Sequence, residues 1–560
     1  MDCLAKARCV VCPFFVGWFN PFLGRGARRG YRLAYAAAVA FFLWNAAQYY
    51  IPGQGFTCLI FFGGASHVQR IRELRSIDYY VDRDSNGYDG QYYAQLAVKP
   101  LLMSRDLAGA MDNLPYRARR ILFSGLAYLF GLGQPAWVLQ AYALENIAAW
   151  LLLAWLLLRW FPPTGPGNLV RWAGVLFAWG LTMSVRQALM DGPSLLVIAW
   201  GVALFEGGRR WTSTCVLGLA GLGRETNLLA VPALAPGADW SWAEVGRAAV
   251  RSVLAVLPLA AWVACIWWVC GQPSNAGVGN FGRPFTAYFG KWFDAWRDFR
   301  LNGWDSSGKW MLIMLASLTV QMLVILLRPR WANPWWRVGA PFAVLLIFLG
   351  PAVWDGYPGA AARVVVPMTL AFNVLVPRGL RWWPLLLLGN LSALSAIDQL
   401  RPPGIESYRL EGMVGVWRAP TQQTITVDFG DAWYQPEKSH LEYWRWSRGS
   451  AGLRINNPQN VPVEVNLRFD LRALDVRRVR IYQGATMRWE GSVTRDGTAV
   501  SLPGIRLAPG DNPWRFETDK PPIVPEGDTL RPVTFNLRNL VIEAVRKDPP
   551  SPAGDVRRGR

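Results

Sequence analysis

The sequence predicts a mainly α-helical fold: a multi-pass transmembrane helical bundle followed by a soluble C-terminal β-sandwich or jelly-roll domain. Two observations lead to this prediction. Hydrophobic residues make up 52% of the 560 residues and charged residues only 17%, whereas soluble proteins average about 25% charged residues. The hydrophobic residues form long runs up to about residue 400, and beyond it they alternate with polar residues. Long runs indicate lipid-facing helices, and alternation indicates half-buried strands.

Several apolar runs approach the length of about 20 residues that a helix needs to cross a bilayer. They lie at residues 32–51, 137–158, 168–184, 190–206, 249–270, 310–328, 338–353, 364–377 and 383–398. Another run, 213–235, is interrupted by Gly223-Arg-Glu-Thr-Asn227, and we interpret it as two short helices that bend there. This interpretation gives about 11 crossings, and a single crossing at 213–235 gives about ten.

Basic residues between the runs predict the orientation of the bundle. Cytoplasmic loops are rich in Lys and Arg, and such residues cluster before residue 32 and around Arg209, Arg328 and Arg378. Segment 1–31 is therefore predicted to be cytoplasmic. Residues 32–399 form the transmembrane domain of a protein of the cytoplasmic membrane. Residues 400–545 are predicted to be periplasmic or extracellular, and the basic tail 546–560 to be disordered.

The net charge of +20 raises the alternative of nucleic-acid binding. Nucleic-acid-binding proteins concentrate their charge on one face, whereas the arginines of this chain are distributed between apolar runs. The sequence therefore argues against a nucleic-acid partner and for a lipid bilayer. The seven cysteines are irregularly spaced and there are only two histidines, so neither a disulfide framework nor a zinc site is indicated.

The first external loop, residues 52–136, carries the main candidate site. Long loops are usually functional, and this loop contains Gly87-Tyr-Asp-Gly-Gln-Tyr-Tyr-Ala-Gln95. Asp89 can accept a proton from an attacking hydroxyl, with Asp82 and Asp84 as rival catalytic bases. These three aspartates can instead hold a divalent cation, although no cofactor is firmly implied. A structural role is also open, because Asp89 can cap a helix that begins at the next residue.

This loop, with an Asp among aromatic residues, resembles the GT-C superfamily of membrane glycosyltransferases. The string from Gly87 to Gln95 is similar to a signature of bacterial membrane proteins that form cell-surface glycopolymers. Arg224-Glu-Thr226 resembles the Lys-Glu-Thr turn of such enzymes, with Arg in place of the more usual Lys. The resemblance covers residues 30–400. It implies transfer of a sugar from a polyprenyl-phosphate carrier to a glycan or lipid acceptor on the external face of the cytoplasmic membrane.

Further residues of the predicted external side are assigned to substrate binding. Aromatic rings can stack on sugars, and arginine can hold a phosphate. The predicted substrate-binding residues are Tyr88, Gln91, Tyr92, Tyr93, Arg117, Asp191, Arg224, Glu225, Asp355 and Arg363. Structural alternatives stay open for some of them. Arg224 and Glu225 can pair with each other, and Asp191 can cap the helix that follows it.

The C-terminal region, residues 400–545, is rich in short alternating segments and in aromatic residues. The stretch from Gly430 to Ser447 looks like part of the jelly-roll domains attached to membrane glycosyltransferases. Aromatic platforms bind sugars, but the same side chains also fill protein cores. The carbohydrate-contact candidates are Trp433, Tyr434, Trp444 and Trp446.

Two other functional classes stay open. A transporter or flippase of lipid-linked glycans is one, although transporters often contain inverted repeats with polar sites near the midplane. No clear repeat is visible here, and the unusual polar residues gather on the predicted external side of the membrane. A non-catalytic scaffold that holds glycans through its β-domain is the other. Substitution of Asp89 separates an enzyme from such a scaffold.

Overall fold

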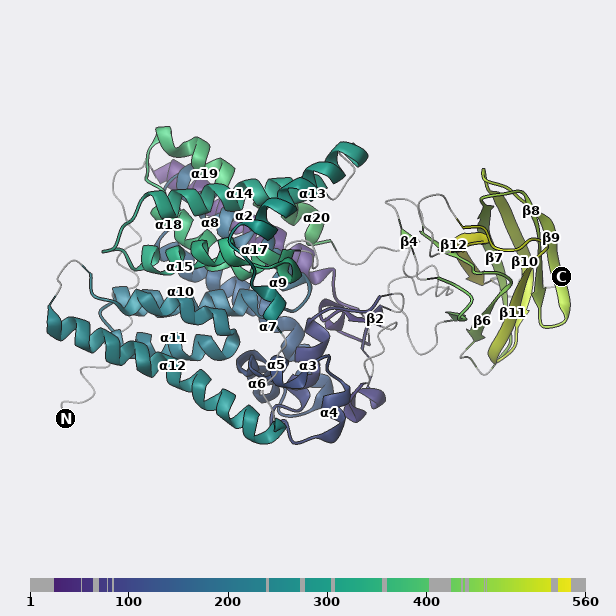
Figure 1. Cartoon of the computed structure of the whole chain (residues 1–560), viewed down its shortest axis with the longest axis horizontal. Coiled ribbons are helices and arrows are strands. Elements are labelled where there is room, and N and C mark those ends of the chain that lie inside the picture. The colour runs from purple at the N-terminus through teal and green to yellow at the C-terminus, as the bar shows by residue number, and fades with distance from the viewer. Residues whose placement is uncertain are drawn as a thin grey trace, which may run out of the picture. The chain divides into compact units, whose positions relative to one another are not determined.

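The structure is a computed structural model. It describes residues 25–51, 53–63, 70–77, 79–82, 85–237, 241–271, 277–303, 308–354, 360–401, 425–434, 437–438, 443–457, 459, 461–524 and 532–544. Asp84, Asp355 and the tail 546–560 lie outside these residues, as does most of segment 1–31. The chain divides into two compact units, Met1–Pro402 and Pro403–Arg560 (Figure 1).

The first unit is helical. Its α-helices are α2 (Arg25–Ala47), α3 (Gly90–Val98), α4 (Arg105–Gly109), α5 (Leu114–Ala118), α6 (Ile121–Phe130), α7 (Pro135–Leu156), α8 (Pro166–Leu176), α9 (Trp179–Arg186), α10 (Asp191–Glu206), α11 (Arg210–Gly223), α12 (Trp242–Cys270), α13 (Thr286–Asn302), α14 (Gly308–Leu327), α15 (Pro334–Phe348), α16 (Pro351–Trp354), α17 (Ala360–Val364), α18 (Val366–Leu375), α19 (Trp383–Gly389) and α20 (Ala396–Gln399). Its 3-10 helices include η2 (Thr57–Leu59), η3 (Arg72–Ser76), η4 (Leu157–Arg159), η5 (Glu225–Leu234), η6 (Val278–Asn280), η8 (Leu380–Trp382) and η9 (Leu391–Ser395). Two short parallel strands, β1 (Phe62–Gly63) and β2 (Val81–Asp82), pair in the first loop.

Three helical segments among the described residues are long and apolar enough to cross a membrane: Pro135–Arg159, Trp242–Cys270 and Gly308–Leu327. Shorter apolar helices occur at Ile121–Phe130, Pro334–Phe348 and Val366–Leu375. Only 17% of the most apolar window of α12 is buried, and large exposed apolar surfaces need a lipid or protein cover. The first unit is thus the body of a membrane protein, whereas the number of about 11 crossings stays a prediction.

Three of the predicted spans are not continuous helices. Residues 168–184 form α8 and α9, residues 338–353 form α15 and α16, and residues 383–398 form α19, η9 and α20. The prediction of single helices is wrong here because apolar composition does not distinguish one long helix from short helices packed inside a bundle. Thr286–Asn302 is also absent from the predicted spans, because charged residues interrupt its apolar positions.

The predicted bend within 213–235 is present. The helices α11 and η5 meet at Arg224, which has extended backbone angles, and Nδ2 of Asn227 donates to the carbonyl of Ala220 at 2.8 Å. Arg210 at the start of α11 pairs with Glu244 at the start of α12 at 2.7 Å. The chain therefore turns back at Arg224 and returns to the end from which α11 began, and α10, α11 and α12 lie side by side (Figure 1).

Basic residues from loops far apart in sequence gather at one end of α10. Arg159 pairs with Glu206, the last residue of α10, at 3.3 Å. Nη2 of Arg378 donates to the carbonyl of Trp160 at 3.4 Å. Asp191, the first residue of α10, lies at the opposite end. The helix therefore separates a basic end of the unit from an end that carries an acidic residue.

The second unit consists of two five-stranded antiparallel sheets. The strands are β3 (Thr426–Phe429), β4 (Glu437–Lys438), β5 (Tyr443–Trp446), β6 (Ala451–Asn457), β7 (Val463–Ala473), β8 (Arg477–Gln483), β9 (Thr486–Val493), β10 (Thr498–Leu507), β11 (Gly510–Thr518) and β12 (Phe535–Ala544). The strand orders are β10-β7-β12-β5-β4 and β3-β6-β11-β8-β9. Strands β5 to β12 thus follow the order of a jelly roll, with β4 and β3 added at two edges.

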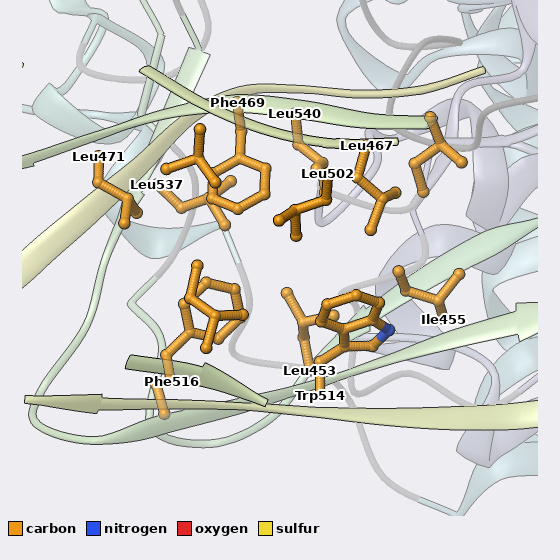
Figure 2. Packing of buried hydrophobic residues seen from close by; sticks show 14 of the residues in the cluster. Leu453, Ile455, Leu467, Phe469, Leu471, Leu502, Trp514, Phe516, Leu537 and Leu540 are labelled. Carbon is orange, nitrogen blue, oxygen red and sulfur yellow. The ribbon is translucent and has the colours of Figure 1, made fainter. Parts of the chain in front are cut away.

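Alternating side chains of both sheets form one core. On β6 and β7 every second residue is buried, as period-two side-chain alternation requires. Leu467, Phe469 and Leu537 of one sheet face Leu453 and Phe516 of the other (Figure 2).

Candidate functional site

One cavity of the helical unit gathers most of the predicted site residues. Its volume is about 440 Å³, which is within the usual range for sites of small ligands. The predicted residues that line it are Tyr88, Asp89, Tyr93, Arg117, Asp191, Arg224 and Arg363. The predicted residues Asp82, Gln91, Tyr92 and Glu225 are described by the structure but do not line this cavity.

Asp89 lies directly before α3, but its side chain makes no capping hydrogen bond to that helix. Its Oδ1 instead pairs with Nη2 of Arg117 at 2.9 Å. Two glycines of the string permit this local structure. Gly87 has a φ of +72°, which glycine adopts readily, and a Cβ at Gly90 would lie 2.5 Å from the carbonyl oxygen of Gln187. The glycines thus allow the chain on both sides of Asp89 to pack closely against neighbouring backbone.

Gln91 and Tyr92 support the loop around this carboxylate. Gln91 is 1% exposed. Its Nε2 donates to the carbonyl of Asn86 at 2.9 Å, and its Oε1 accepts from the backbone N–H of Gly63 at 3.3 Å. The guanidinium of Arg117 lies over the ring of Tyr92, with 4.8 Å between its central carbon and the ring centroid. Packing and hydrogen bonds within the loop therefore account for Gln91 and Tyr92 of the string.

Arg117 joins two carboxylates at the cavity. Its Nε and Nη2 donate to the two oxygens of Asp112 at 2.9 and 2.7 Å, in the forked geometry typical of strong arginine–carboxylate pairs. The same Nη2 reaches Asp89. Burial alone would raise the pKa of Asp89, but the charges of Arg117 and Arg363 and the hydrogen bond from Arg117 outweigh it and lower the pKa. Asp89 is therefore ionised at neutral pH.

Asp191 connects two arginines from distant parts of the chain. Its Oδ1 pairs with Nη1 of Arg224, and its Oδ2 pairs with Nη1 of Arg363 at 3.3 Å. The Asp191 side chain is only 3% exposed. Nη2 of Arg363 also donates to the hydroxyl of Tyr88 at 2.7 Å. The carboxylate thus holds two cations next to each other in the cavity wall.

Glu225 does not pair with its neighbour in sequence. Its Oε2 accepts from Nε of Arg120 at 2.9 Å. Arg120 also donates to the hydroxyls of Tyr93 at 2.7 Å and Tyr116 at 2.9 Å, and Nδ2 of Asn280 donates to the Tyr116 hydroxyl at 3.2 Å. These contacts join the first loop to the bend after α11 and to the segment before α13.

Four lining residues are not among those that the sequence predicts: Asp112, Tyr116, Arg120 and Asn280. The first three belong to a cluster of acidic, aromatic and basic residues at 112–120. Such a cluster indicates a functional segment, but the sequence does not show which of its side chains point into a cavity. Asn280 follows a glycine in a polar segment and carries no such signal.

Charged side chains form much of the cavity wall. Four arginines and three aspartates are among its lining residues, and Glu225, which does not line the cavity, pairs with the fourth arginine, Arg120. Charge interactions are stronger in such a partly enclosed site than in water. The described residues contain no group of three or more His, Cys, Asp or Glu side chains suited to a metal ion. Asp82 lies on β2 opposite Gly63 and Asp84 is outside the described residues, so the divalent cation stays an untested alternative.

The four aromatic candidates of the C-terminal unit have different surroundings. Trp433 is 5% exposed and belongs to the core, and the hydroxyl of Tyr434 donates to the carbonyl of Pro532 at 2.9 Å. On β5, Arg445 is buried, while its neighbours Trp444 and Trp446 on either side are half-buried. The two tryptophans therefore lie on the opposite face of the sheet from Arg445.

Comparisons with known proteins add a weak likeness among solved structures. No protein family matches the chain, and no curated protein matches it. Among solved structures, that of the arabinosyltransferase EmbB from Mycobacterium smegmatis is similar over 90% of this chain and 64% of that chain, with 11% sequence identity and a TM-score of 0.25. This chain thus spans less than two thirds of that chain's length. A TM-score of this size does not establish a common fold.

Proposed function

We propose that this chain is a membrane glycosyltransferase. It moves a sugar from a polyprenyl-phosphate carrier to a hydroxyl of a glycan or lipid acceptor on the external face of the cytoplasmic membrane. One observation carries the proposal: a single cavity contains the Asp89 carboxylate together with the arginine pair Arg224 and Arg363. A base for the acceptor and cations for the leaving phosphate are the two chemical requirements of this transfer. The apolar helices of the same unit suit a carrier that resides in a membrane.

In the proposed step the acceptor oxygen attacks the anomeric carbon of the sugar. The bond between that carbon and the phosphate oxygen of the carrier breaks, and the bonding electrons leave with the phosphate. Asp89 accepts the proton of the acceptor hydroxyl. Arg117 keeps Asp89 ionised and fixes its direction, so that the carboxylate is oriented before the acceptor arrives.

Arg224 and Arg363 are proposed to hold the phosphate of the carrier. Asp191 fixes both guanidinium groups while leaving further N–H groups on each. A phosphate bound beside the two guanidinium groups accepts hydrogen bonds from their remaining N–H groups, and these cations stabilise the charge that develops on the leaving group.

The test is sugar transfer by purified protein from a radiolabelled pool of polyprenyl-phosphate sugars, with Asp89→Asn beside the wild type. Removal of a general base lowers the rate by about 10²–10⁴-fold, so we expect Asp89→Asn to lose nearly all transfer at normal abundance. Asp82→Asn is the matched control, because Asp82 does not line the cavity, and it should retain transfer.

The other outcomes identify the alternatives. Loss of transfer in Asp82→Asn and retention in Asp89→Asn would move the base to Asp82. No transfer by the wild type from any of several donors would contradict an enzyme and favour a transporter or flippase of lipid-linked glycans, or a glycan-assembly scaffold.

A further inference from the structure

Four exposed arginines come from two neighbouring loops of the helical unit. We call them the arginine cluster: Arg328 and Arg330, which follow α14, and Arg378 and Arg381, which lie between α18 and α19. The segments that carry them, 326–337 and 375–389, contain no acidic residue. No member of the cluster forms an ion pair with a residue that the structure describes. Arginines gathered without a counter-charge repel one another and attract an anion.

The arginine cluster lies at the basic end of the helical unit. Arg159 of this end is compensated, because it pairs with Glu206 at 3.3 Å. The next residue, Trp160, accepts a hydrogen bond at its carbonyl from Nη2 of Arg378 at 3.4 Å, which joins the cluster to the same end. Asp191 of the cavity is at the opposite end of α10. The cluster is therefore separate from the candidate site.

Two members of the cluster share one aromatic ring. The guanidinium carbon of Arg328 lies 4.0 Å from the centroid of the Trp382 ring, and that of Arg381 lies 5.3 Å from it. Both distances are within the range of a cation–π interaction. Trp382 therefore holds two positive charges from separate loops next to each other. Arginine presents its N–H groups as a fork that fits phosphate oxygens, so this pair suits a phosphate group.

Backbone hydrogen bonds fix the loops beneath this pair. Nη1 of Arg330 donates to the carbonyl of Leu375 at 2.7 Å, and Nη2 of Arg171 donates to the carbonyl of Pro377 at 3.0 Å. Basic side chains commonly bind the last carbonyls of a helix in this way, which gives Arg330 a structural role at the end of α18. Arg328 and Arg381 donate to no carbonyl of the described residues, so their N–H groups are available to a ligand.

The surroundings of the cluster suit a ligand that is partly apolar. Leu327 and Leu380, each directly before an arginine of the cluster, are 74% and 86% exposed. Leu327 is also the last residue of Gly308–Leu327, which is long and apolar enough to cross a membrane. A second such segment, Pro135–Arg159, ends directly before Trp160. Two apolar segments thus end beside the cluster, and basic residues next to the ends of such segments attract anionic lipids.

We infer that the arginine cluster binds the head group of an anionic phospholipid. Arg328 and Arg381 contact its phosphate over the ring of Trp382, and Leu327 and Leu380 contact its acyl chains. A small soluble anion would leave both leucines uncovered, whereas a phospholipid supplies the charge and the apolar part together. The inference does not depend on the proposed function, because the cluster and the cavity lie at opposite ends of α10.

The experiment is native mass spectrometry of the full chain in a neutral detergent, titrated with phosphatidylglycerol or with phosphatidylcholine. The wild type should bind phosphatidylglycerol more tightly. Arg328→Gln/Arg381→Gln should weaken the binding of phosphatidylglycerol about tenfold and leave that of phosphatidylcholine unchanged. Arg328→Lys/Arg381→Lys keeps both charges and should recover part of the lost affinity. The substituted side chains are exposed, so the thermal unfolding temperature of each variant should match that of the wild type.

Arg210→Gln/Arg247→Gln is the matched control. These two side chains are 47% and 60% exposed, and each pairs with Glu244 at 2.7 Å. The control loses the same number of charges from the helical unit, but outside the arginine cluster. It should bind phosphatidylglycerol as tightly as the wild type does.

Three outcomes would overturn the inference. Equal weakening by both glutamine variants would show that net charge alone attracts the lipid. Equal affinity of the wild type for the two lipids would leave an acidic protein as the occupant of the cluster. Displacement of phosphatidylglycerol by inorganic phosphate at equal concentration would indicate a site for free phosphate. None of these measurements uses a sugar donor, so the test of the proposed function is unaffected by their results.

Discussion

Arg117 determines the state of Asp89 more directly than any other residue of the site. It is 9% exposed at its side chain and contacts both Asp89 and Asp112 through one nitrogen. Burial by itself would favour the neutral form of Asp89, and the arginine reverses this preference. We regard Arg117 as a positioning residue, because it acts on the acceptor proton only through Asp89.

Arg117→Gln should shift the pH dependence of sugar transfer. A lowered pKa keeps Asp89 ionised, and the carboxylate becomes protonated only as the pH falls through that lowered value. Without the Arg117 charge the pKa of Asp89 rises, so the acidic limb of the rate profile should move to higher pH. The measurement is the transfer rate against pH.

Arg119→Gln serves as the control for this shift. Arg119 is close in sequence to Arg117 but does not line the cavity. The acidic limb of the rate profile of Arg119→Gln should therefore match that of the wild type. Coincident profiles for Arg117→Gln and the wild type would contradict the assigned role of Arg117.

At the scale of elements, the site depends on close contact between short helices. A Cβ at Gly180 of α9 would lie 2.5 Å from the carbonyl oxygen of Ala362 on α17, and Arg363 is the next residue. The position of Arg363 therefore depends on close backbone packing of α9 against α17. Interiors packed at this density do not absorb an added methyl group without movement.

Gly180→Ala should lower transfer by displacing α17 and with it Arg363. Overpacking of this kind costs about 1–3 kcal/mol, so thermal stability should fall as well. Gly167→Ala on α8 is the matched control, because its nearest neighbouring atom would lie at 3.8 Å and alanine favours a helix. The measurements are the transfer rate and the thermal unfolding temperature of both variants. Equal transfer rates and equal unfolding temperatures for Gly180→Ala and Gly167→Ala would contradict the role of close packing at Gly180.

Trp444 and Trp433, two of the aromatic candidates of the second unit, have opposite surroundings. Trp444 faces away from the core, beside Arg538, whose guanidinium carbon is 4.7 Å from its ring, and its Nε1 donates to Glu437 at 2.9 Å. Trp433 instead packs against Phe516 and Phe535 at 5.7 Å each. A ring flanked by polar groups on an outer sheet face suits a sugar, and a ring within the core does not.

Trp444→Ala should therefore weaken binding of the full chain to soluble cell-envelope polysaccharide, measured by affinity electrophoresis, without lowering thermal stability. Trp433→Ala should instead destabilise the second unit by about 3–5 kcal/mol, the usual result of removing a buried Trp. Unchanged migration of Trp444→Ala in the polysaccharide gel would argue that this face does not bind glycans.

At the scale of the whole chain, the basic loops and the cavity belong to opposite ends of α10. Positively charged loops stay on the cytoplasmic side, and we therefore expect the cavity to open toward the external side. A phosphatase that is active only outside the cytoplasm should be active when fused after residue 560 and inactive when fused after residue 332. The opposite pattern would invert the orientation and place the proposed reaction inside the cell.

Much of the candidate site was predictable because its residue types are unusual where they occur. Asp89, Asp191, Arg224 and Arg363 are charged residues next to apolar runs, and such residues are costly unless they are paired or functional. Their partners were not predictable. Arg224 pairs with Asp191 rather than with Glu225, which pairs with Arg120, because pairing depends on which helix ends meet and not on sequence neighbours.

The sequence by itself determined the division into an apolar helical part and a β-rich part, and the bend near Arg224. These features follow from composition and periodicity, which act locally along the chain. The tertiary structure decided that 168–184 is two helices, that Gln91 supports the loop, and that Asp112 and Asn280 reach the cavity. Such features depend on contacts between segments far apart in sequence, whose energies no local pattern encodes.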